Sequence, residues 1–406
     1  MQLKKFLAAG AGAALALTLA ACGGSGAGSE PEASGTAGGG GGAAEEGGTI
    51  GVAMPTQTTE RWIADGNFVK EGLEEAGFEV DLQYAGDDIP TQSQQIDNMI
   101  TNGVSVLIIA AIDGTALSSQ LAAAAEAGIP VISYDRLIRD SENVDFYVTF
   151  DNYKVGVQQA TSLLTGLGIL DESGAETGET GPFNIEMFAG SLDDNNAHFF
   201  WQGAQDTLAP YLESGVLVVP SGQMDIEQAA TQGWLQETAQ KRMEDLLTAG
   251  YVGTDKKVQA VLAPNDGLAR GVITALQNNG YAGTIADGFP IVTGQDAEIA
   301  SVKLIRDGVQ YSTVFKDTRK LAAQAITAAE AFLAGEEPEA NDTETYDNGV
   351  KVVPSYLLES DTVRADDVQS VLIDSGYWTE EQVEAGVAYA PRGPGAGGLA
   401  GTGLLS

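Results

Sequence analysis

The chain has 406 residues, and because hydrophobic cores stop growing near ~250 to 300 residues, two lobes are expected. Its 20 Lys and Arg residues against 57 Asp and Glu residues give a formal net charge of −37, which argues strongly against nucleic-acid binding because both partners would be anionic. One cysteine excludes an intrachain disulfide, and one histidine excludes a histidine-based metal cluster and leaves little room for a His-dependent triad.

The first 22 residues have the features of a bacterial export signal. Lys4 and Lys5 precede an apolar stretch at residues 6–21, which is shorter than the ~20 residues of a membrane-spanning helix. Residues 19–22, Leu-Ala-Ala-Cys, resemble a lipobox, in which the cysteine sulfur is diacylated before cleavage. We therefore expect an extracytoplasmic lipoprotein anchored to the cell membrane through Cys22. The alternative is an ordinary signal peptide that contains a cysteine by chance.

Both ends of the exported chain have low sequence complexity. Residues 23–48 are almost only Gly, Ala, Ser, Thr and Glu, so they bury too little apolar surface to fold, and we interpret them as a tether with a reach of roughly 30 Å. Residues 386–406 are similar and are expected to form a disordered tail. No later segment is long and apolar enough to span a bilayer, so we expect membrane contact through the lipid only.

Between residue 49 and about residue 377, short apolar runs alternate with longer segments of helical period. The expected strands, in chain order, are residues 50–53, 80–84, 104–111, 130–134, 146–150, 183–188, 258–263, 291–293 and 311–315. Apolar residues recur at helical spacing in residues 200–212, 235–247 and 321–332, which predicts helices. This alternation, with continuous apolarity in several strands, predicts an α/β fold with parallel sheets covered on both faces. The body is therefore expected to be two doubly wound lobes.

Polar side chains follow most of these strands, at the ends where open parallel sheets bind their ligands. In chain order they are Asp113, Asp135, Arg136, Asp151, Asn152, Asn265, Asp266, Gln295, Asp296 and Lys316. A single Asp after a strand usually caps the next helix. The recurrence of the pattern, with amides and cations among the acids, predicts a cleft suited to a neutral ligand that carries many hydroxyl groups.

Sugars also have apolar faces, so a sugar site normally adds flat aromatic walls. Trp62 follows Arg61 at the start of the first expected helix, and Trp234 opens the helix that contains Leu235. Both tryptophans lie in polar, loop-like contexts, which favours a stacking role. The alternative is that they are partly buried packing residues.

Several motifs of the chain resemble one family. They are Glu60-Arg61-Trp62, residues 134–138 (Tyr-Asp-Arg-Leu-Ile), residues 149–152 (Thr-Phe-Asp-Asn), residues 190–196, residues 294–297 (Gly-Gln-Asp-Ala) and residues 348–355. Together they resemble the periplasmic sugar-binding (solute-binding) proteins of ABC transporters, in particular the members that bind D-xylose or multiple sugars. The resemblance covers residues 50 to about 382.

The resemblance implies a type I periplasmic binding protein fold, in which two doubly wound parallel-sheet lobes are joined by a three-strand hinge. The N-terminal lobe would take residues 49–151 and about 318–350, and the C-terminal lobe residues 152–317 and about 351–385. It also implies a monomer that is not an enzyme, and neither cofactor nor metal is expected. Matching motifs place the sugar contacts on Arg61, Trp62, Asp135, Arg136, Asn196, Trp234, Asn265, Asp296 and Lys316.

The expected function is capture of an aldose, such as xylose, glucose, galactose or arabinose, and its delivery to an ABC permease and the associated ATPase. A sugar-sensing receptor that docks on a membrane signalling protein is an alternative compatible with transport. A secreted glycosidase would need two carboxyl groups, for which Asp135 and Asp296 are candidates. It is less favoured, because Arg136 and Lys316 beside them should keep both ionised and leave no general acid.

Overall fold

The computed structural model of the chain describes residues 48–388. The predicted signal segment, Cys22, the tether up to residue 47 and the tail from residue 389 lie outside the described residues. The predicted α/β fold is confirmed, and each of the nine predicted strands overlaps a strand of the structure. None of the helices within residues 48–388 combines the length and apolarity needed to cross a bilayer.

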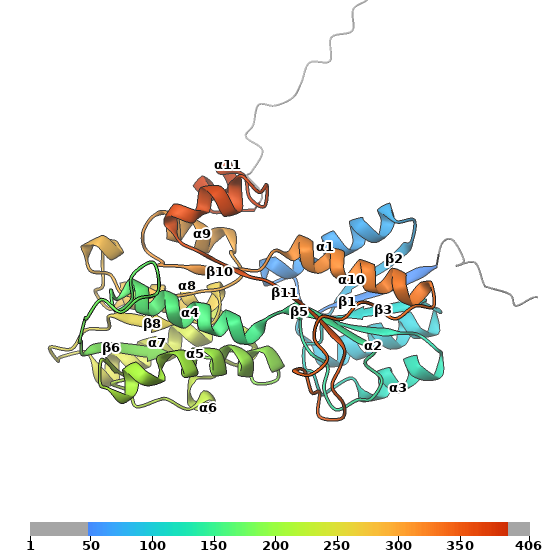
Figure 1. Cartoon of the computed structure of the whole chain (residues 1–406), viewed down its shortest axis with the longest axis horizontal. Helices are drawn as coiled ribbons and strands as arrows, with labels where there is room; N and C mark the ends of the chain where they lie inside the picture. Colours follow the sequence, from blue (N-terminus) through green and yellow to red (C-terminus); the bar gives the residue numbers. More distant parts are fainter. Residues whose placement is uncertain (1–47, 389–406) are drawn as a thin grey trace, which may run out of the picture. The chain divides into compact units, whose positions relative to one another are not determined.

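The first lobe is built on a six-stranded parallel sheet with the order β11-β5-β4-β3-β1-β2 (Figure 1). Its strands are β1 Thr49–Met54, β2 Glu79–Tyr84, β3 Val106–Ile109, β4 Val131–Tyr134, β5 Phe146–Phe150 and β11 Ser355–Leu358. Its helices are α1 Glu60–Glu75, α2 Ile89–Thr101, α3 Ser118–Glu126 and α10 Thr318–Leu333. Helices α1 and α10 cover one face of this sheet, and α2 and α3 cover the other.

The second lobe is built on a four-stranded parallel sheet with the order β7-β6-β8-β9. Its strands are β6 Phe183–Met187, β7 Leu217–Val218, β8 Ala260–Leu262 and β9 Ile291–Val292, with the antiparallel pair β10 Thr313–Phe315 and β12 Asp361–Val363 beside it. Its helices are α4 Asn152–Gly166, α5 Asn195–Glu213, α6 Ile226–Ala229, α7 Gln236–Gly250, α8 Asp266–Asn278, α9 Ile299–Arg306 and α11 Glu380–Ala385. Helices α4 and α5 pack on one face of the four-stranded sheet, and α7 and α8 on the other.

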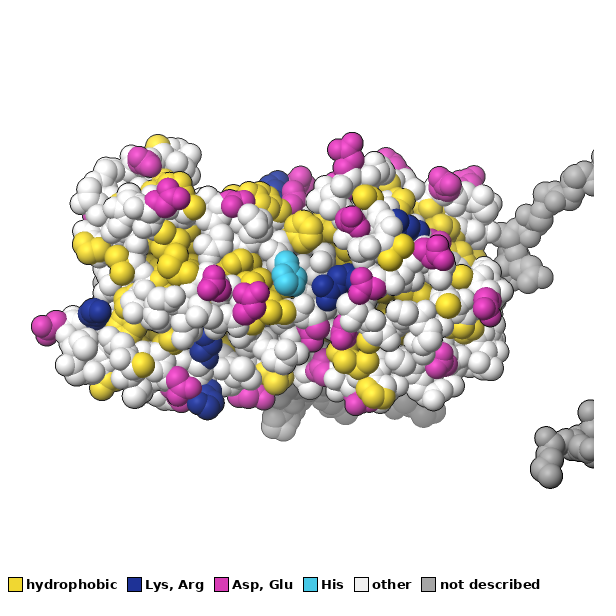
Figure 2. All heavy atoms as spheres, turned by 90° about the horizontal axis from the view of Figure 1, so that it is seen from below, with side chains coloured by type: hydrophobic (Ala, Val, Ile, Leu, Met, Phe, Trp, Pro, Cys, Tyr) yellow, Lys and Arg dark blue, Asp and Glu magenta, His cyan; other side chains and the backbone are white. Residues whose placement is uncertain are grey.

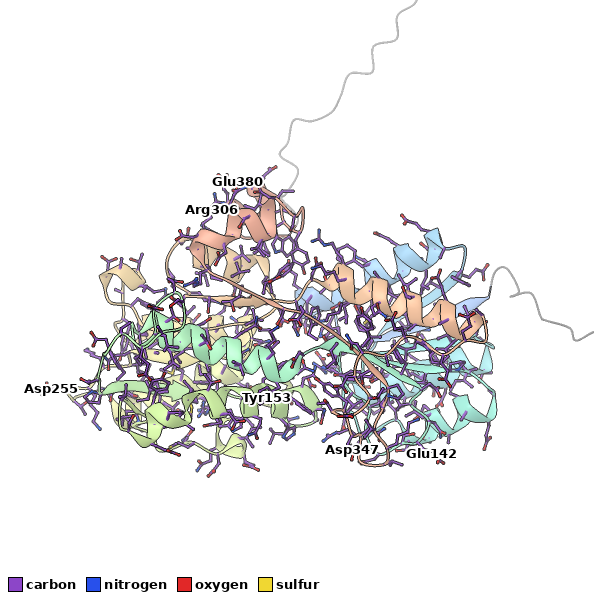
Figure 3. All side chains as sticks on the ribbon, in the orientation of Figure 1. Glu142, Tyr153, Asp255, Arg306, Asp347 and Glu380 are labelled. Carbon is purple, nitrogen blue, oxygen red and sulfur yellow. The ribbon has the colours of Figure 1, made fainter. Side chains whose placement is uncertain are left out.

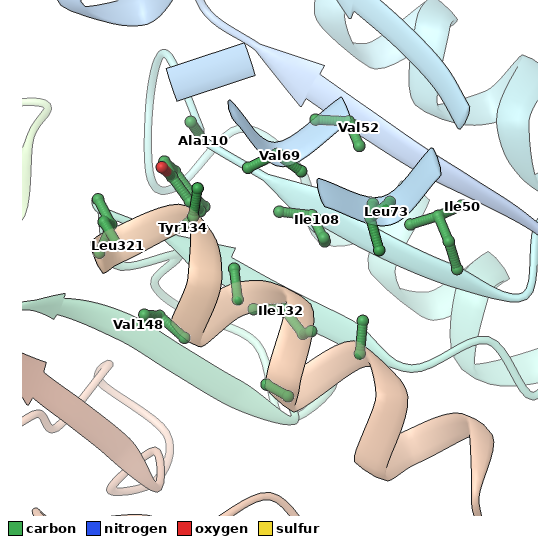
Figure 4. Close-up of a cluster of buried hydrophobic side chains, with 14 of the residues drawn as sticks. Ile50, Val52, Val69, Leu73, Ile108, Ala110, Ile132, Tyr134, Val148 and Leu321 are labelled. Carbon is green, nitrogen blue, oxygen red and sulfur yellow. The ribbon is translucent and has the colours of Figure 1, made fainter. Parts of the chain in front are cut away.

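Alternate residues of each central strand point to opposite faces of the sheet, so a strand buried on both sides is apolar throughout. On one face of the first sheet, side chains of β1, β3, β4 and β5 pack against α1 and α10 (Figure 4). The fully buried residues drawn there include Ile50, Val52, Val69, Leu73, Ile108, Ile132, Val148 and Leu321. Burial of each large apolar side chain stabilises the folded state by about 1.5–3 kcal/mol. This packed face therefore supports the residues at the strand ends.

The two lobes are connected three times. Strand β5 leads into α4 through Asp151, β10 leads into α10 through Lys316 and Asp317, and β11 leads into β12 through Glu359 and Ser360. The third connection lies later in the chain than the predicted lobe boundary near residue 350, because β11 pairs in parallel with β5 and so belongs to the first sheet. The first two connections each pass directly from the end of a strand to the start of a helix.

Side-chain caps fix two of these helix starts. The Asp151 carboxylate accepts a hydrogen bond from the Lys154 backbone N–H at 3.0 Å, and Asp317 accepts one from Arg319 N–H at 3.1 Å. The capping role anticipated for such residues therefore holds at Asp151. At the other end of the described chain, α11 packs on α9 and is tied to it by an ion pair between Arg306 and Glu380 (Figure 3).

Candidate functional site

One pocket lies between the carboxyl ends of the two sheets, and all nine of the predicted site residues line it. The lining residues are Thr59, Arg61, Trp62, Asp135, Arg136, Asp194, Asn196, Phe200, Trp234, Asn265, Gln295, Asp296 and Lys316. The empty space between them, including its open side, measures ≈ 380 Å³. Both lobes contribute, so the pocket exists only where the lobes meet.

The pocket concentrates cations in an acidic protein. Figure 2 shows Asp and Glu side chains spread over one face of the molecule, with fewer Lys and Arg among them. In the pocket, by contrast, Arg61, Arg136 and Lys316 come together, and Arg61 and Lys316 are only 6% and 3% exposed. Buried cations persist only where carboxylates pair with them.

Arg61 and Lys316 share their carboxylate partners. Arg61 reaches Asp65 at 2.8 Å, Asp135 at 3.0 Å and Asp296 at 3.5 Å, so a residue of the first lobe contacts a carboxylate of the second. Lys316 lies 3.2 Å from Asp296 and 3.8 Å from Asp135. The result is an alternating arrangement of two cations and two carboxylates on the pocket wall, able to donate and accept hydrogen bonds side by side.

Asp135 is held ionised by this arrangement. Burial raises the pKa of the Asp135 carboxyl, but the positive charges of Arg61, Lys316 and Arg136 lower it by more, so the pKa lies below its ordinary value. Asp65, behind Arg61 and fully buried, has its pKa raised to about 6 because burial outweighs the attraction of Arg61. Asp135 therefore presents a permanent hydrogen-bond acceptor to the pocket.

Arg136, which was expected beside Asp135, makes its ion pair with a different carboxylate. The guanidinium Nε of Arg136 instead lies 3.1 Å from Asp194, a residue of the second lobe. Burial raises the pKa of Asp194, and the charge of Arg136 partly opposes this. The reason is that Asp135 already has two cationic partners, whereas Asp194 would be a buried charge without Arg136.

Asp135 directly follows β4, whereas Asp296 follows Gln295, which forms a bridge with Val314 beyond the end of β9; both aspartates have left-handed backbone, φ 60 and φ 94. The Asp135 N–H donates to Val148 O at 2.8 Å, and the Asp296 N–H donates to Val314 O at 2.8 Å. Such a conformation costs a non-glycine residue roughly 1–2 kcal/mol, so these neighbouring strands must impose it. The turn aims both carboxylates into the pocket.

Asn196 ties the two lobes together. Its amide Nδ2 donates to the Asp135 carbonyl at 2.9 Å, and its Oδ1 accepts from Tyr147 Oη at 3.0 Å and from Asn152 Nδ2 at 3.1 Å. The side chain therefore has one N–H left for a ligand. It also holds Asp135 in place from the opposite lobe.

Trp62 and Trp234, the two residues predicted to be aromatic walls, both line the pocket. The Trp62 ring is buried, and the guanidinium groups of Arg61 and Arg136 lie 4.5 Å and 5.1 Å from its centroid. Trp234 ends a 3-10 turn before α7 rather than opening the helix itself, and its backbone is left-handed at φ 56. Its ring lies so close to Gly190 that a Cβ there would be 2.1 Å from the indole, which requires glycine at that position.

Asn265 and Gln295 supply amides from the second lobe. Asn265 Oδ1 caps α8 by accepting a hydrogen bond from the Leu268 N–H at 2.9 Å. Because Asn265 also lines the pocket, its side-chain NH₂ group is available to donate there. The Gln295 Oε1 and the Trp234 indole N–H are buried and have no hydrogen-bond partner within residues 48–388. An acceptor and a donor are thereby available for a ligand.

Four lining residues were not predicted as site residues: Thr59, Asp194, Phe200 and Gln295. Gln295 appeared among the strand-end side chains, and Asp194 within the matched motif at residues 190–196, so both had a signal in the sequence. Phe200 was read as a core position of its helix. Conversely, four of the strand-end residues do not line the pocket: Asp113, Asp151, Asn152 and Asp266. Among residues 48–388, no group of three or more His, Cys, Asp and Glu side chains is arranged to hold a metal ion.

Comparison with known proteins places this geometry in a family. The family model described as "Periplasmic binding protein domain" matches residues 50–337. The multiple sugar-binding periplasmic receptor ChvE of Rhizobium radiobacter is 53% identical over 341 residues, covering 84% of this chain and 94% of that protein. The D-xylose-binding periplasmic protein of Escherichia coli is 37% identical over 334 residues, covering 82% of this chain and 92% of that protein.

A solved structure agrees with these sequence matches. It is an ABC transporter solute binding protein from Clostridium phytofermentans with bound β-D-glucose, which is 48% identical and superimposes with a TM-score of 0.76, covering 82% of this chain and 99% of that one. The chain therefore belongs to the periplasmic binding protein family, in the group of sugar-binding proteins that includes ChvE and the D-xylose-binding protein.

Proposed function

We propose that the protein captures an aldose monosaccharide, such as xylose, glucose, galactose or arabinose, and delivers it to the permease and ATPase of an ABC importer. The observation that carries this proposal is the pocket between the lobes, in which ionised Asp135 stands beside Arg61 and Lys316. The family consists of binding proteins, so the site has a binding role and not a catalytic one.

The alternation of charges suits sugar hydroxyls. A hydroxyl group donates one hydrogen bond and accepts others, so it satisfies a carboxylate and a neighbouring cation at once. Asp135 and Asp296 would accept, while Arg61, Arg136, Lys316 and the amides of Asn196 and Asn265 would donate. Hydrogen bonds to charged groups contribute about 1.5–3 kcal/mol each, so a few of them account for tight binding of a small neutral ligand.

The aromatic rings would sandwich the ring of the sugar. Trp62 comes from α1 in the first lobe and Trp234 from the turn before α7 in the second, and both line the pocket. Stacking on an indole adds about 0.5–1.5 kcal/mol beyond the apolar area buried. Because hydrogen bonds come from both lobes as well, the sugar would favour the closed arrangement of the lobes.

The N-terminal features complete the proposal. Cys22 would carry a lipid that holds the protein at the outer side of the cell membrane, with residues 23–48 as a tether. We further propose that the chain works as a monomer and contacts the membrane through that lipid only. Docking of the sugar-bound form on a membrane signalling protein is compatible with this role.

Isothermal titration of the protein with D-xylose, L-arabinose, D-glucose and D-galactose tests the proposal. We expect saturable one-to-one binding of at least one sugar with a Kd below about 10 μM, a free energy of roughly −7 kcal/mol. Sugar alcohols of the same length serve as controls, because they lack the ring that the two tryptophans would stack on. Absence of binding by all four aldoses at millimolar concentration would refute the proposal.

A further inference from the structure

A second cross-lobe contact lies outside the sugar pocket. Glu60, the first residue of α1, belongs to the first lobe, and its Oε2 accepts a hydrogen bond from the backbone N–H of Ile299 at 3.3 Å. Ile299 is the first residue of α9 in the second lobe. Glu60 does not line the pocket with the nine site residues; it lines a neighbouring groove, which shares Thr59, Trp234 and Asn265 with that pocket.

On the second lobe, Glu60 faces a cluster with more acids than cations. Glu298 is 3% exposed and pairs with Arg270 Nη2 at 2.6 Å. Asp266, which is fully buried, accepts from Glu298 N–H at 3.0 Å and from Thr313 Oγ1 at 3.1 Å. Three carboxyl groups thus share the single guanidinium of Arg270, and burial followed by the charge of Glu298 raises the pKa of Asp266 well above its ordinary value.

The surroundings of the cluster do not relieve the excess of acid. The other charged side chains on the same groove are Asp87 of the first lobe and Glu237 of the second, both acidic. Asp266 also accepts from the Gln310 amide at 2.8 Å, and Arg270 donates to Ser301 Oγ at 3.0 Å, but these partners are neutral. When the lobes close, the Glu60 carboxylate of the first lobe therefore approaches a groove with net negative charge.

We propose that Glu60 is a positioning residue for the closed state, which latches the lobes outside the sugar pocket and binds a proton more readily when the lobes close. The inference rests on the proposed function, because closure is what the sugar would stabilise. The hydrogen bond from Ile299 holds the lobes together, and the proton removes the repulsion between Glu60 and Glu298 that would oppose closure. On opening, Glu60 regains water and releases the proton.

The direction of the linkage follows from the contacts. In the closed arrangement burial raises the pKa of Glu60, the charge of Glu298 raises it further, and the Ile299 hydrogen bond and Arg270 partly oppose these effects. With the lobes apart, Glu298 and Arg270 no longer face Glu60, so its pKa returns toward the ordinary value. A group whose pKa is higher in the closed state favours closure at low pH, and this advantage is lost as the pH rises through the closed-state pKa.

The test compares sugar affinity across pH in matched variants. D-glucose is titrated calorimetrically between about pH 4 and pH 7, around the ordinary carboxyl pKa of Glu, in two buffers of different ionisation enthalpy. The proteins are the wild type, Glu60→Gln, and Glu71→Gln as a control on the exposed side of the same helix. We expect the wild type and Glu71→Gln to bind glucose more tightly as the pH falls and to take up protons on binding. The gain in affinity should be at most tenfold for each pH unit that separates the open-state and closed-state pKa of Glu60.

Glu60→Gln should bind at pH 7 at least as tightly as the wild type, with a flatter pH dependence and less proton uptake, because the amide oxygen still accepts from Ile299. Two outcomes overturn the proposal. One is a pH dependence in Glu60→Gln identical to that of Glu71→Gln. The other is weaker binding of Glu60→Gln at every pH, which would make Glu60 a simple hydrogen-bond partner.

A sugar-free measurement separates this proposal from the proposed function. Spin labels are placed on exposed positions of the two lobes, Glu142→Cys and Asp255→Cys, in a Cys22→Ser background (Figure 3). Without sugar, the shorter inter-label distance should become more populated as the pH falls, and Glu60→Gln should remove this change. If the distance distribution does not change with pH in the wild type, or changes equally in Glu60→Gln, the latch is refuted even where sugar binding is found. If it changes in the wild type and not in Glu60→Gln, the latch stands even where no aldose binds.

Discussion

Replacement of Asp135 by Asn tests the charge network of the pocket with little disturbance of shape. The residue sits at φ 60, and Asn is one of the few residues that tolerate left-handed backbone, so the turn after β4 should persist. The substitution removes the ion pair with Arg61 at 3.0 Å and the longer contact with Lys316 at 3.8 Å, and turns a charged acceptor into a neutral one. The perturbation is therefore confined to one charge.

The expected loss follows from these contacts. Each hydrogen bond that a sugar hydroxyl makes to a buried carboxylate is worth about 1.5–3 kcal/mol, and Arg61 keeps Asp65 and Asp296 as partners, so only part of its pairing is lost. We predict a fall in sugar affinity of roughly 2–4 kcal/mol, about 30- to 1,000-fold. The loss should differ between epimers, because a carboxylate accepts from particular hydroxyls.

Calorimetric titration of the variant with the four aldoses provides the assay. Asp113→Asn is the matched control, because Asp113 also follows a strand of the first lobe but accepts from the Thr115 N–H at 2.8 Å and does not line the pocket. The control should bind as the wild type does. Unchanged affinity of Asp135→Asn for every sugar that the wild type binds would refute the assignment of the site.

Three further predictions concern the walls of the pocket and the anchor. Trp62→Phe should lower affinity by about 1 kcal/mol for all aldoses without changing their order, and a changed order would contradict a stacking role. Gly190→Ala should displace the Trp234 indole, since the added Cβ would meet the ring at 2.1 Å; calorimetry and tryptophan fluorescence should show weaker binding and a shifted emission, and normal binding would contradict the close packing. Cys22→Ser should release the protein from membranes with its thermal unfolding unchanged, whereas retention after a high-salt wash would contradict lipid anchoring.

Much of the fold was predictable because its signal is local. Nine apolar runs were recognised as strands since both faces of each sheet are covered, and the helical periods at residues 200–212, 235–247 and 321–332 correspond to α5, α7 and α10. The strands that were not predicted are β7, β11 and β12. Strand β12 begins with the polar residues Asp361 and Thr362, and β11 is ordered by pairing with β5, far away in sequence.

The membership of the pocket was predictable from the strand-end rule and the matched motifs, but its internal pairing was not. Arg136 pairs with Asp194, and Asn196 makes hydrogen bonds with Asp135 and Tyr147. These pairs could not be predicted because the partners are about 50 to 60 residues apart and become neighbours only on folding. The left-handed backbone conformation of Asp135 could not be predicted from the sequence either, since Asp is common in ordinary turns. The sequence therefore predicted which residues line the pocket better than it predicted the contacts among them.

The most direct test of the account is a crystal structure of the protein grown with saturating D-glucose. The account predicts the sugar between the lobes, with ring hydroxyls within hydrogen-bond distance of Asp135 and Arg61 and with its faces toward Trp62 and Trp234. A sugar bound elsewhere, or this pocket filled only by water at saturation, would contradict it.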